Sequence, residues 1–316
     1  MQLVGQKEQV TVGAGRARSR TRTRVVCAAL LAVAVAAVAS GCGDTEAGEA
    51  AGADKVKGVS GQQRPLTKEE AAAKQRAEQT ARAAAAKRWG LDKTPLPAPP
   101  PPAKKPQITP RAGFEVEDQD ELPPVFTTIP TKDKIVFLTI DDGADKDPAL
   151  LRMMDDLKIP YTAFLSNYLA KEDYGYFRKM RDQGVTLNNH TLTHPYLPGL
   201  DYDQQKREIC GMQDVMRKEF GKRPEVFRPP YGNYNQDTLR AAKSCGIKAV
   251  PLWNEEVFVD HWEYREWDQK LRPGDIVLTH FRGKNDWKGT MPDDIRQFMK
   301  LITDKGYAVA KLEDYL

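Results

Sequence analysis

The chain has 316 residues, of which 40% are hydrophobic, enough for one large domain or two ordinary ones. Its formal net charge is +4, but residues 1–41 hold six basic residues and one acidic residue, which contribute +5 and leave −1 for the remainder. A nucleic-acid-binding domain needs a basic surface on its folded part, so this distribution argues against a nucleic-acid partner. Aromatic residues become frequent only from Phe114 onward, which predicts one folded domain in the C-terminal two thirds.

Residues 1–41 are typical of an export signal. An arginine-rich stretch precedes an apolar run over residues 25–39, shorter than the roughly 20 residues of a membrane-spanning helix. The sequence Ala39-Ser40-Gly41-Cys42 resembles the bacterial lipobox, although Ala39 stands where Leu is more common. It implies cleavage before Cys42 and a lipid on its sulfur. The alternatives are an ordinary signal peptide cut nearby or an uncleaved short anchor. We expect a lipoprotein on the outer face of the cell membrane, with secretion as the alternative.

Residues 42–112 have the composition of a flexible tether. Residues 43–61 are rich in Gly, Ala and acids, with little to bury. Residues 68–88 are strong helix formers with almost no apolar side chain beyond alanine, which predicts a solvated helix. Residues 95–106 are rich in proline and favour a stiff extended spacer. The folded domain is therefore expected over residues 113–316.

Strand and helix patterns alternate through this domain. Asp147-Pro148, for example, combines an N-cap acid with proline at the first helical position. We expect strands at 135–140, 161–165, 185–189, 226–227, 249–253, 276–279 and 307–312. We expect helices at 148–157, 174–182, 201–220, 235–245 and 292–304. Repeated βα units predict an α/β fold with a parallel sheet wrapped by helices. About seven strands favour a distorted or incomplete (β/α) barrel over the full eight-unit form.

Two carboxylates, Asp141 and Asp142, directly follow the first of these strands. Adjacent buried acids repel each other and lose solvation, and a bound cation would offset both costs. His190 and His194 follow another strand, four residues apart, on what would be a single turn ended by Pro195. Positions i and i+4 of a helical turn share a face, so both imidazoles could bind one ion. The alternative is a pair of surface histidines.

Two further segments carry candidate catalytic groups. In Arg228-Pro229-Pro230-Tyr231-Gly232 the prolines restrict the backbone, so this loop could aim a backbone N–H at a developing oxyanion. Arg228 could pair with Asp141. His280 ends the strand at 276–279 and could act as a general acid. The alternatives are a rigid structural turn and a structural histidine.

The motifs TIDDG, HTLTH, RPPYG and LTH resemble, in order and spacing, those of the polysaccharide deacetylase family, also called the NodB homology domain or carbohydrate esterase family 4. The resemblance covers roughly residues 131–316 and implies a distorted (β/α) barrel. It implies that Asp142, His190 and His194 bind one divalent metal ion, with Zn²⁺ favoured over Co²⁺, Ni²⁺ or Mn²⁺. The remaining implied roles are general base for Asp141, its partner for Arg228, an oxyanion contact for the N–H of Tyr231, pocket lining for Leu278, Trp253 and Pro230, and general acid for His280.

The chain departs from the family pattern after Trp253, where an acid normally tunes the catalytic histidine. The candidates for that acid are Glu255, Glu256 and Asp260, or no residue supplies it. Cys210 and Cys245 could form a disulfide, as expected in an exported domain, or remain buried thiols.

We therefore expect a metal-dependent hydrolase that removes N-acetyl groups from a cell-wall polysaccharide, with N-acetylglucosamine or N-acetylmuramic acid units of peptidoglycan as its substrate. One alternative is an O-acetyl esterase acting on a xylan-like polysaccharide. The other is a non-catalytic glycan-binding lipoprotein, suggested by the altered fourth motif. The expected partners are an acetylated glycan and a membrane reached through lipidated Cys42. The sequence leaves the oligomeric state open.

Overall fold

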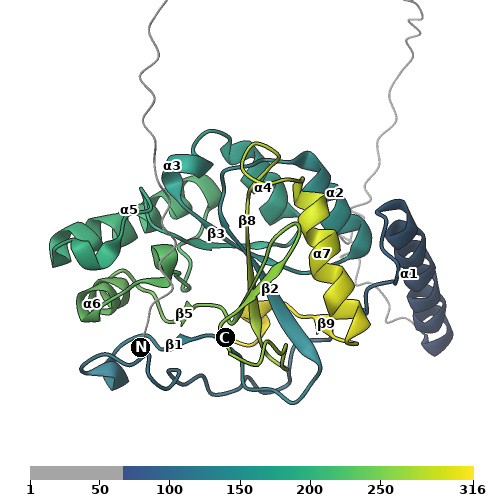
Figure 1. The fold of residues 1–316 in the computed structure, drawn as a ribbon, viewed down its shortest axis with the longest axis horizontal. Helices are drawn as coiled ribbons and strands as arrows, with labels where there is room; N and C mark the ends of the chain where they lie inside the picture. The colour runs from purple at the N-terminus through teal and green to yellow at the C-terminus, as the bar shows by residue number, and fades with distance from the viewer. Residues whose placement is uncertain (1–66) are drawn as a thin grey trace, which may run out of the picture. The chain divides into compact units, whose positions relative to one another are not determined.

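The computed structural model describes residues 67–316. The expected signal segment, Cys42 and the first part of the expected tether lie outside the described residues. The central sheet has the strand order β4-β3-β2-β8-β6-β7, and β9 pairs with β2 (Figure 1). Its strands are β2 (Ile135–Asp142), β3 (Thr162–Leu165), β4 (Thr186–Asn189), β6 (Glu255–Val257), β7 (Trp262–Tyr264), β8 (Ile276–His280) and β9 (Ala308–Val309).

β2 is the centre of this sheet, and all eight of its residues are buried. It pairs in parallel with β3 on one side and with β8 on the other. Strands that are covered on both faces carry continuous apolar runs, as residues 135–138 do here. The polar residues Asp141 and Asp142 therefore lie at the carboxyl end of a fully buried central strand.

A distorted barrel is the architecture that the sequence predicted. A second parallel pair, β1 (Val125–Phe126) and β5 (Val250–Pro251), lies beyond β4. Isolated parallel bridges Asn189↔Phe227 and Val226↔Ala249 connect the row of strands from β4 towards β5. The structure differs from the expectation at β7, which is antiparallel to β6. Its sequence Trp262-Glu263-Tyr264 is only half-buried or exposed, so it lacks the apolar run on which the strand expectations relied.

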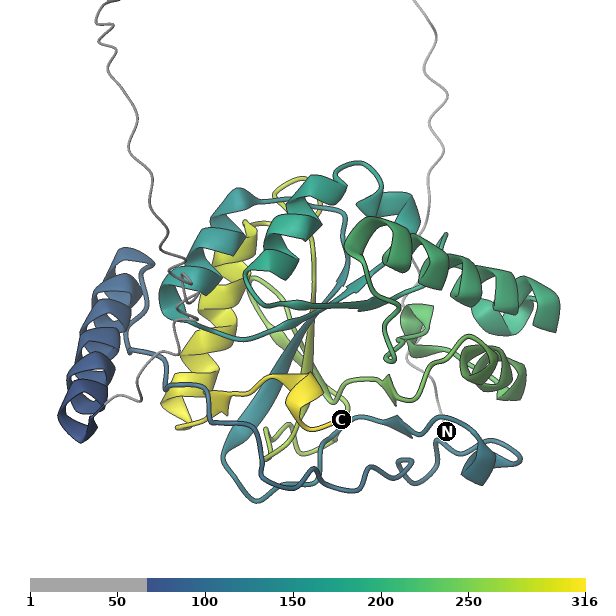
Figure 2. The same cartoon turned by 180° about the vertical axis from the view of Figure 1, so that it is seen from behind.

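Helices pack around the outside of the strands (Figures 1 and 2). They are α2 (Pro148–Leu157), α3 (Asn167–Ala170), α4 (Tyr174–Asp182), α5 (Tyr202–Phe220), α6 (Gln236–Ser244) and α7 (Met291–Asp304). Short 3-10 turns occupy Gln119–Glu121, Leu197–Gly199, Pro230–Gly232 and Leu312–Asp314. Asp147 caps α2 by accepting a hydrogen bond from the backbone N–H of Ala149, as expected for an acid followed by proline. Within the described residues no helix is both long and apolar enough to cross a membrane.

Cys210 of α5 and Cys245, which follows α6, form a disulfide. The two helices lie side by side in Figure 1. Gln213 of α5 adds two buried hydrogen bonds, to the carbonyl oxygens of Pro224 and Cys245. The disulfide therefore joins two helices that already pack against each other.

The flexible tether expected over residues 42–112 packs against the domain in part of its described range. Helix α1 (Lys68–Arg88) is solvated over most of its length, but Ala85 and Ala86 near its end are buried in the main hydrophobic core. The indole N–H of Trp89 donates to Asp156 at 2.8 Å, and Arg111 donates to Asn254 at 2.6 Å. Residues 85–112 therefore form an arm on the domain, because specific side chains anchor a segment whose composition indicated only a linker.

Candidate active site

The site begins where β2 ends. Asp141 and Asp142 are each 2% exposed, and the chain turns sharply there, with φ of 80° at Asp142 and 95° at Gly143. A Cβ atom at Gly143 would also lie 3.0 Å from the ring of Phe177. Both the positive φ and the lack of space at this position therefore require glycine. Within β2 and β8, Asp141 is in register with His280. The carboxyl ends of β2 and β8 thus bring the TIDDG and LTH motifs to one edge of the sheet.

Three side chains could hold a metal ion. The ligand atoms of Asp142, His190 and His194 all lie within 4.8 Å of one another. Oδ1 of Asp142 is 3.5 Å from Nε2 of His190 and 3.3 Å from Nε2 of His194. This buried oxygen has no hydrogen-bond partner among the described residues, an arrangement that is costly unless a cation binds there.

The protonation of the two imidazoles suits this role. Nδ1 of His190 lies 2.7 Å from the carbonyl oxygen of Arg228. Because a carbonyl can only accept, Nδ1 carries the proton and Nε2 presents a lone pair. Burial lowers the pKa of His194 to about 3, so its ring is neutral at neutral pH. The residues present therefore fit a divalent cation held by one carboxylate and two imidazoles.

The histidine loop reaches this geometry in a way that the sequence analysis did not predict. Thr191 has φ of 72° and His194 has φ of 59°, so residues 190–194 do not form a helical turn. Asn189 stabilises the loop because its side-chain oxygen accepts from the N–H of Thr191 at 2.9 Å. The expectation of a shared helical face was wrong, although the two imidazoles do converge.

Asp141 is not one of the three candidate metal ligands but lies beside His190. Its Oδ1 accepts from Nη1 of Arg228 at 2.8 Å, and its Oδ2 is 3.7 Å from Nε2 of His190. Arg228 is fully buried and also donates to Thr139 and to the carbonyl oxygen of Pro251. Burial lowers the pKa of Arg228, while the charge of Asp141 and its hydrogen bond raise it. The structure thus brings together the predicted pair and adds Thr139, a residue of the TIDDG motif to which the sequence analysis assigned no role.

The open question after Trp253 concerns the partner of His280. Oε1 of Glu256 is 3.2 Å from Nδ1 of His280. Neighbouring residues of a strand point to opposite faces, so Glu255 of β6 faces away and is buried beside Asp275. Asp260 lies in an exposed turn, paired with His261 and Lys288. Of the three candidate acids, Glu256 is the one that contacts His280.

This contact sets the charge of His280. Burial lowers its pKa, but the hydrogen bond and charge of Glu256, together with the charges of Asp142 and Asp141, outweigh burial and raise the pKa to about 9. His280 is therefore a cation at neutral pH and can give up a proton. Because Nδ1 faces Glu256, Nε2 is the nitrogen that can face a substrate.

The remaining predicted pocket residues surround the same edge. Tyr231 has φ of 61° and ψ of 9°, the residue is 58% exposed, and its ring centroid is 4.7 Å from that of His194. Pro230 and Leu278 are buried. Trp253 lies beside Arg228, with the guanidinium carbon 5.6 Å from its ring. The role of the Tyr231 N–H stays a prediction, as do the catalytic roles of the other residues.

Arg282 is the main site residue that the sequence analysis did not predict, and it contacts Asp142. Its Nη2 donates to Oδ2 of Asp142 at 2.7 Å, so one oxygen of this carboxylate is held by arginine while the other faces the two histidines. The only available signal was a cation two residues after His280. Such a signal is weak because most arginines at strand ends are solvated.

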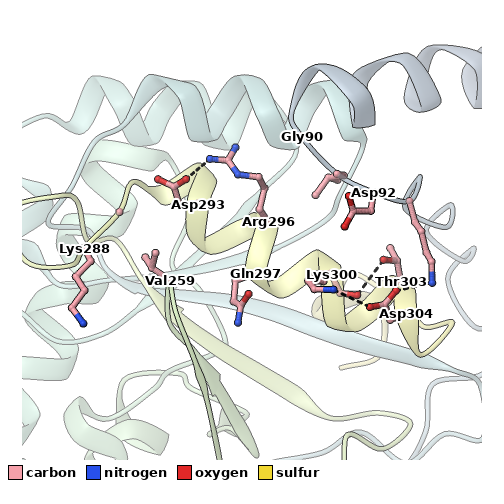
Figure 3. A pocket seen from close by; sticks show the side chains of 13 residues that line it. Gly90, Asp92, Val259, Lys288, Asp293, Arg296, Gln297, Lys300, Thr303 and Asp304 are labelled. Atoms are coloured by element: carbon pink, nitrogen blue, oxygen red, sulfur yellow. Dashed lines mark hydrogen bonds and ion pairs between the residues drawn. The ribbon is translucent and has the colours of Figure 1, made fainter.

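A groove elsewhere on the domain does not belong to this site. Figure 3 shows it between α7, the arm near Gly90 and the loop near Lys288. None of the candidate site residues lines it. Its cations have acidic partners, as in the pairs Lys93–Asp304 and Arg296–Asp293. Because these charges pair with one another, the groove does not indicate an anionic or a cationic ligand.

A family model described as polysaccharide deacetylase matches residues 128–250. An uncharacterized protein of Streptomyces coelicolor is 39% identical over 209 residues, which are 65% of this chain and 83% of that protein. The peptidoglycan-N-acetylmuramic acid deacetylase PdaA of Bacillus subtilis is 25% identical over 219 residues, or 66% of this chain and 81% of the relative.

A solved structure shares the fold. The Bc1960 peptidoglycan N-acetylglucosamine deacetylase superposes with a TM-score of 0.53 at 21% identity, covering 62% of this chain and 94% of that chain. The barrel-like arrangement of strands is thus a known fold.

Proposed function

The chain belongs to the polysaccharide deacetylase family, and from this premise we propose that it hydrolyses N-acetyl groups of N-acetylglucosamine or N-acetylmuramic acid units in peptidoglycan. One observation carries the proposal. The Asp142, His190 and His194 cluster is flanked by Asp141 on one side and lies at the same sheet edge as His280. A base, an acid and a cation site are the groups that amide hydrolysis requires.

Asp142, His190 and His194 would hold the divalent ion, for which Zn²⁺ suits a set of two imidazoles and one carboxylate. Such an ion, when bound, polarises a carbonyl and lowers the pKa of water. His190 is oriented for this by its bond to the carbonyl of Arg228. Arg282 holds the second oxygen of Asp142 and so orients the first.

The protein groups account for the proton movements. Asp141 accepts a proton from the attacking water, and Arg228 keeps the carboxylate in position. A new C–O bond forms at the acetyl carbon, and the N–H of Tyr231 stabilises the resulting oxyanion. His280 then protonates the sugar nitrogen as the C–N bond breaks, which releases acetate and a free amine. Leu278 lines the pocket for the acetyl methyl group, and Trp253 and Pro230 line the rest of the substrate pocket.

The proposal includes the location of the enzyme. The arginine-rich segment, the apolar run at 25–39 and the lipobox ending in Cys42 support export and attachment to the outer face of the cell membrane. A lipid at Cys42 would place the domain beside the peptidoglycan that it is proposed to modify.

Acetate release tests this function. The purified full-length chain should release acetate from N-acetylated glycan oligomers, lose activity with a chelator and regain it when Zn²⁺, Co²⁺, Ni²⁺ or Mn²⁺ is added. Peptidoglycan and chitin oligomers form one arm, and acetylated xylan tests ester hydrolysis in the other. Asp141→Asn is the inactive control. No acetate from any N-acetylated glycan, with metal supplied, would overturn the proposal.

A further inference from the structure

We propose that Phe258, His261 and Trp287, here called the aromatic platform, bind a sugar ring adjacent to the ring that is deacetylated. The platform occupies the tip of the β6–β7 hairpin and the loop 281–290 that follows β8. Glu256 lies on β6, just before the hairpin tip, and His280 ends β8, directly before the loop. The identity of the glycan rests on the proposed function, whereas the presence of a sugar site rests on the geometry below.

The three rings form a continuous row that leads to His280. The rings of Phe258 and His261 are stacked, with centroids 4.5 Å apart and planes 2° apart. Trp287 lies 5.4 Å from Phe258 and 6.3 Å from the ring of His280. A chain held on these rings would therefore meet the proposed general acid, the group that protonates the sugar nitrogen.

The loop and the hairpin are held together by specific contacts. A side chain at Gly289 would lie 2.6 Å from Cγ1 of Val259, so only glycine permits this approach. Lys288 pairs with Asp260 at 3.3 Å across the two segments. The N–H of Trp287 donates to the carbonyl of Gly283 at 2.8 Å. These contacts fix the position of Trp287 relative to the hairpin tip.

The chemistry of the platform matches a sugar ring. Phe258 and Trp287 are half-buried, His261 is exposed, and Phe258 and Trp287 both lie outside the hydrophobic clusters of the described core. A pyranose has apolar C–H faces and a rim of hydroxyl groups, so it suits an aromatic face with polar groups beside it. Asp260, Glu263 and Lys288 supply that polar rim.

Trp287→Ala tests the platform by two readouts. We expect KM for the tetramer of N-acetylglucosamine to rise about tenfold with little change in kcat, since one aromatic contact is lost away from the reacting bond. Calorimetric binding of the tetramer in the Asp141→Asn background should weaken by a similar factor without turnover. The monomer should show no such difference. Trp287→Leu, which keeps an apolar side chain in the loop, should give the same loss of binding.

Trp267→Ala is the matched control, because Trp267 is 92% exposed and lies outside the platform. It should bind and turn over the tetramer as the parent does. Metal content should be unchanged in every variant. Parent-like tetramer binding in both Trp287 variants, or no tetramer binding by the Asp141→Asn protein, overturns the platform. Weakened binding in the Trp287 variants of a chain that releases no acetate would overturn the proposed function and leave the platform standing.

Discussion

Glu256 and His280 form an ion pair across neighbouring parallel strands, with Oε1 3.2 Å from Nδ1. The pair supplies the acidic partner that was missing from the fourth motif of the sequence. It also determines the charge of His280, because the carboxylate outweighs the effect of burial and raises the pKa of the imidazole to about 9.

Glu256→Gln should therefore move the alkaline limb of the pH profile. In the parent, His280 stays protonated through neutral pH and loses its proton as the pH rises through about 9. Without the carboxylate its pKa falls, so activity should decline at a lower pH. The measurement is kcat/KM across the neutral and alkaline range. Asp260→Asn, which changes an exposed acid of the same hairpin, should leave the limb in place. An unmoved limb in Glu256→Gln would contradict the assignment.

His190→Ala and His194→Ala should each abolish metal loading while the fold survives. Each removes one of two imidazole ligands, and the remaining pair of ligands is too few for tight binding. Metal content after dialysis, together with circular dichroism, measures both parts. His261→Ala is the matched control, because His261 lies in an exposed turn away from the cluster. Parent-like metal content in either ligand variant would refute the ligand set.

Arg282→Ala should weaken metal binding by about tenfold to a hundredfold, as found when groups that orient metal ligands are removed. Asp142 would lose the partner of its Oδ2 and with it a fixed orientation. Metal titration of the purified chain reports the change, and Arg282→Lys should restore part of it. Arg240→Ala, an exposed arginine paired with Asp237 on α6, serves as the control. Equal affinity in Arg282→Ala and the parent would show that Asp142 needs no such support.

The arm should contribute to stability. Ala86→Glu places a charge at a position that is 2% exposed, and it should lower the free energy of unfolding by about 1–3 kcal/mol. Ala77→Glu changes an exposed alanine of the same helix and should be nearly neutral. Urea unfolding of both variants makes the comparison. Equal midpoints would mean that residues 85–112 do not pack on the domain in solution.

Removal of the disulfide should destabilise the domain without emptying the metal site. Cys210 and Cys245 are separated by 35 residues, and closing a loop of that size stabilises the folded state by about 2–4 kcal/mol. Cys210→Ser with Cys245→Ser should lower the urea midpoint accordingly. Metal content is the control readout, since neither cysteine contacts the ligands. An unchanged midpoint would show that the packing of α5 on α6 suffices.

The sequence by itself determined the alternation of strands and helices and the position of each motif at a strand end. Parallel strands have their carboxyl ends at one edge of a sheet, so Asp141, His190, Arg228 and His280 had to converge there. That convergence follows from local patterns alone, because each strand is identified by its own apolar run.

Only the tertiary structure decided which side chains meet within that edge. Glu256 rather than Glu255 faces His280 because β6, which no apolar run revealed, alternates its side chains between two faces. Arg282 reaches Asp142, and residues 85–112 lie on the domain, through contacts between segments distant in sequence. Composition and periodicity indicate which secondary structure a segment favours. The partner of a charged or partly polar side chain depends instead on which residues the fold places within a few ångströms of it.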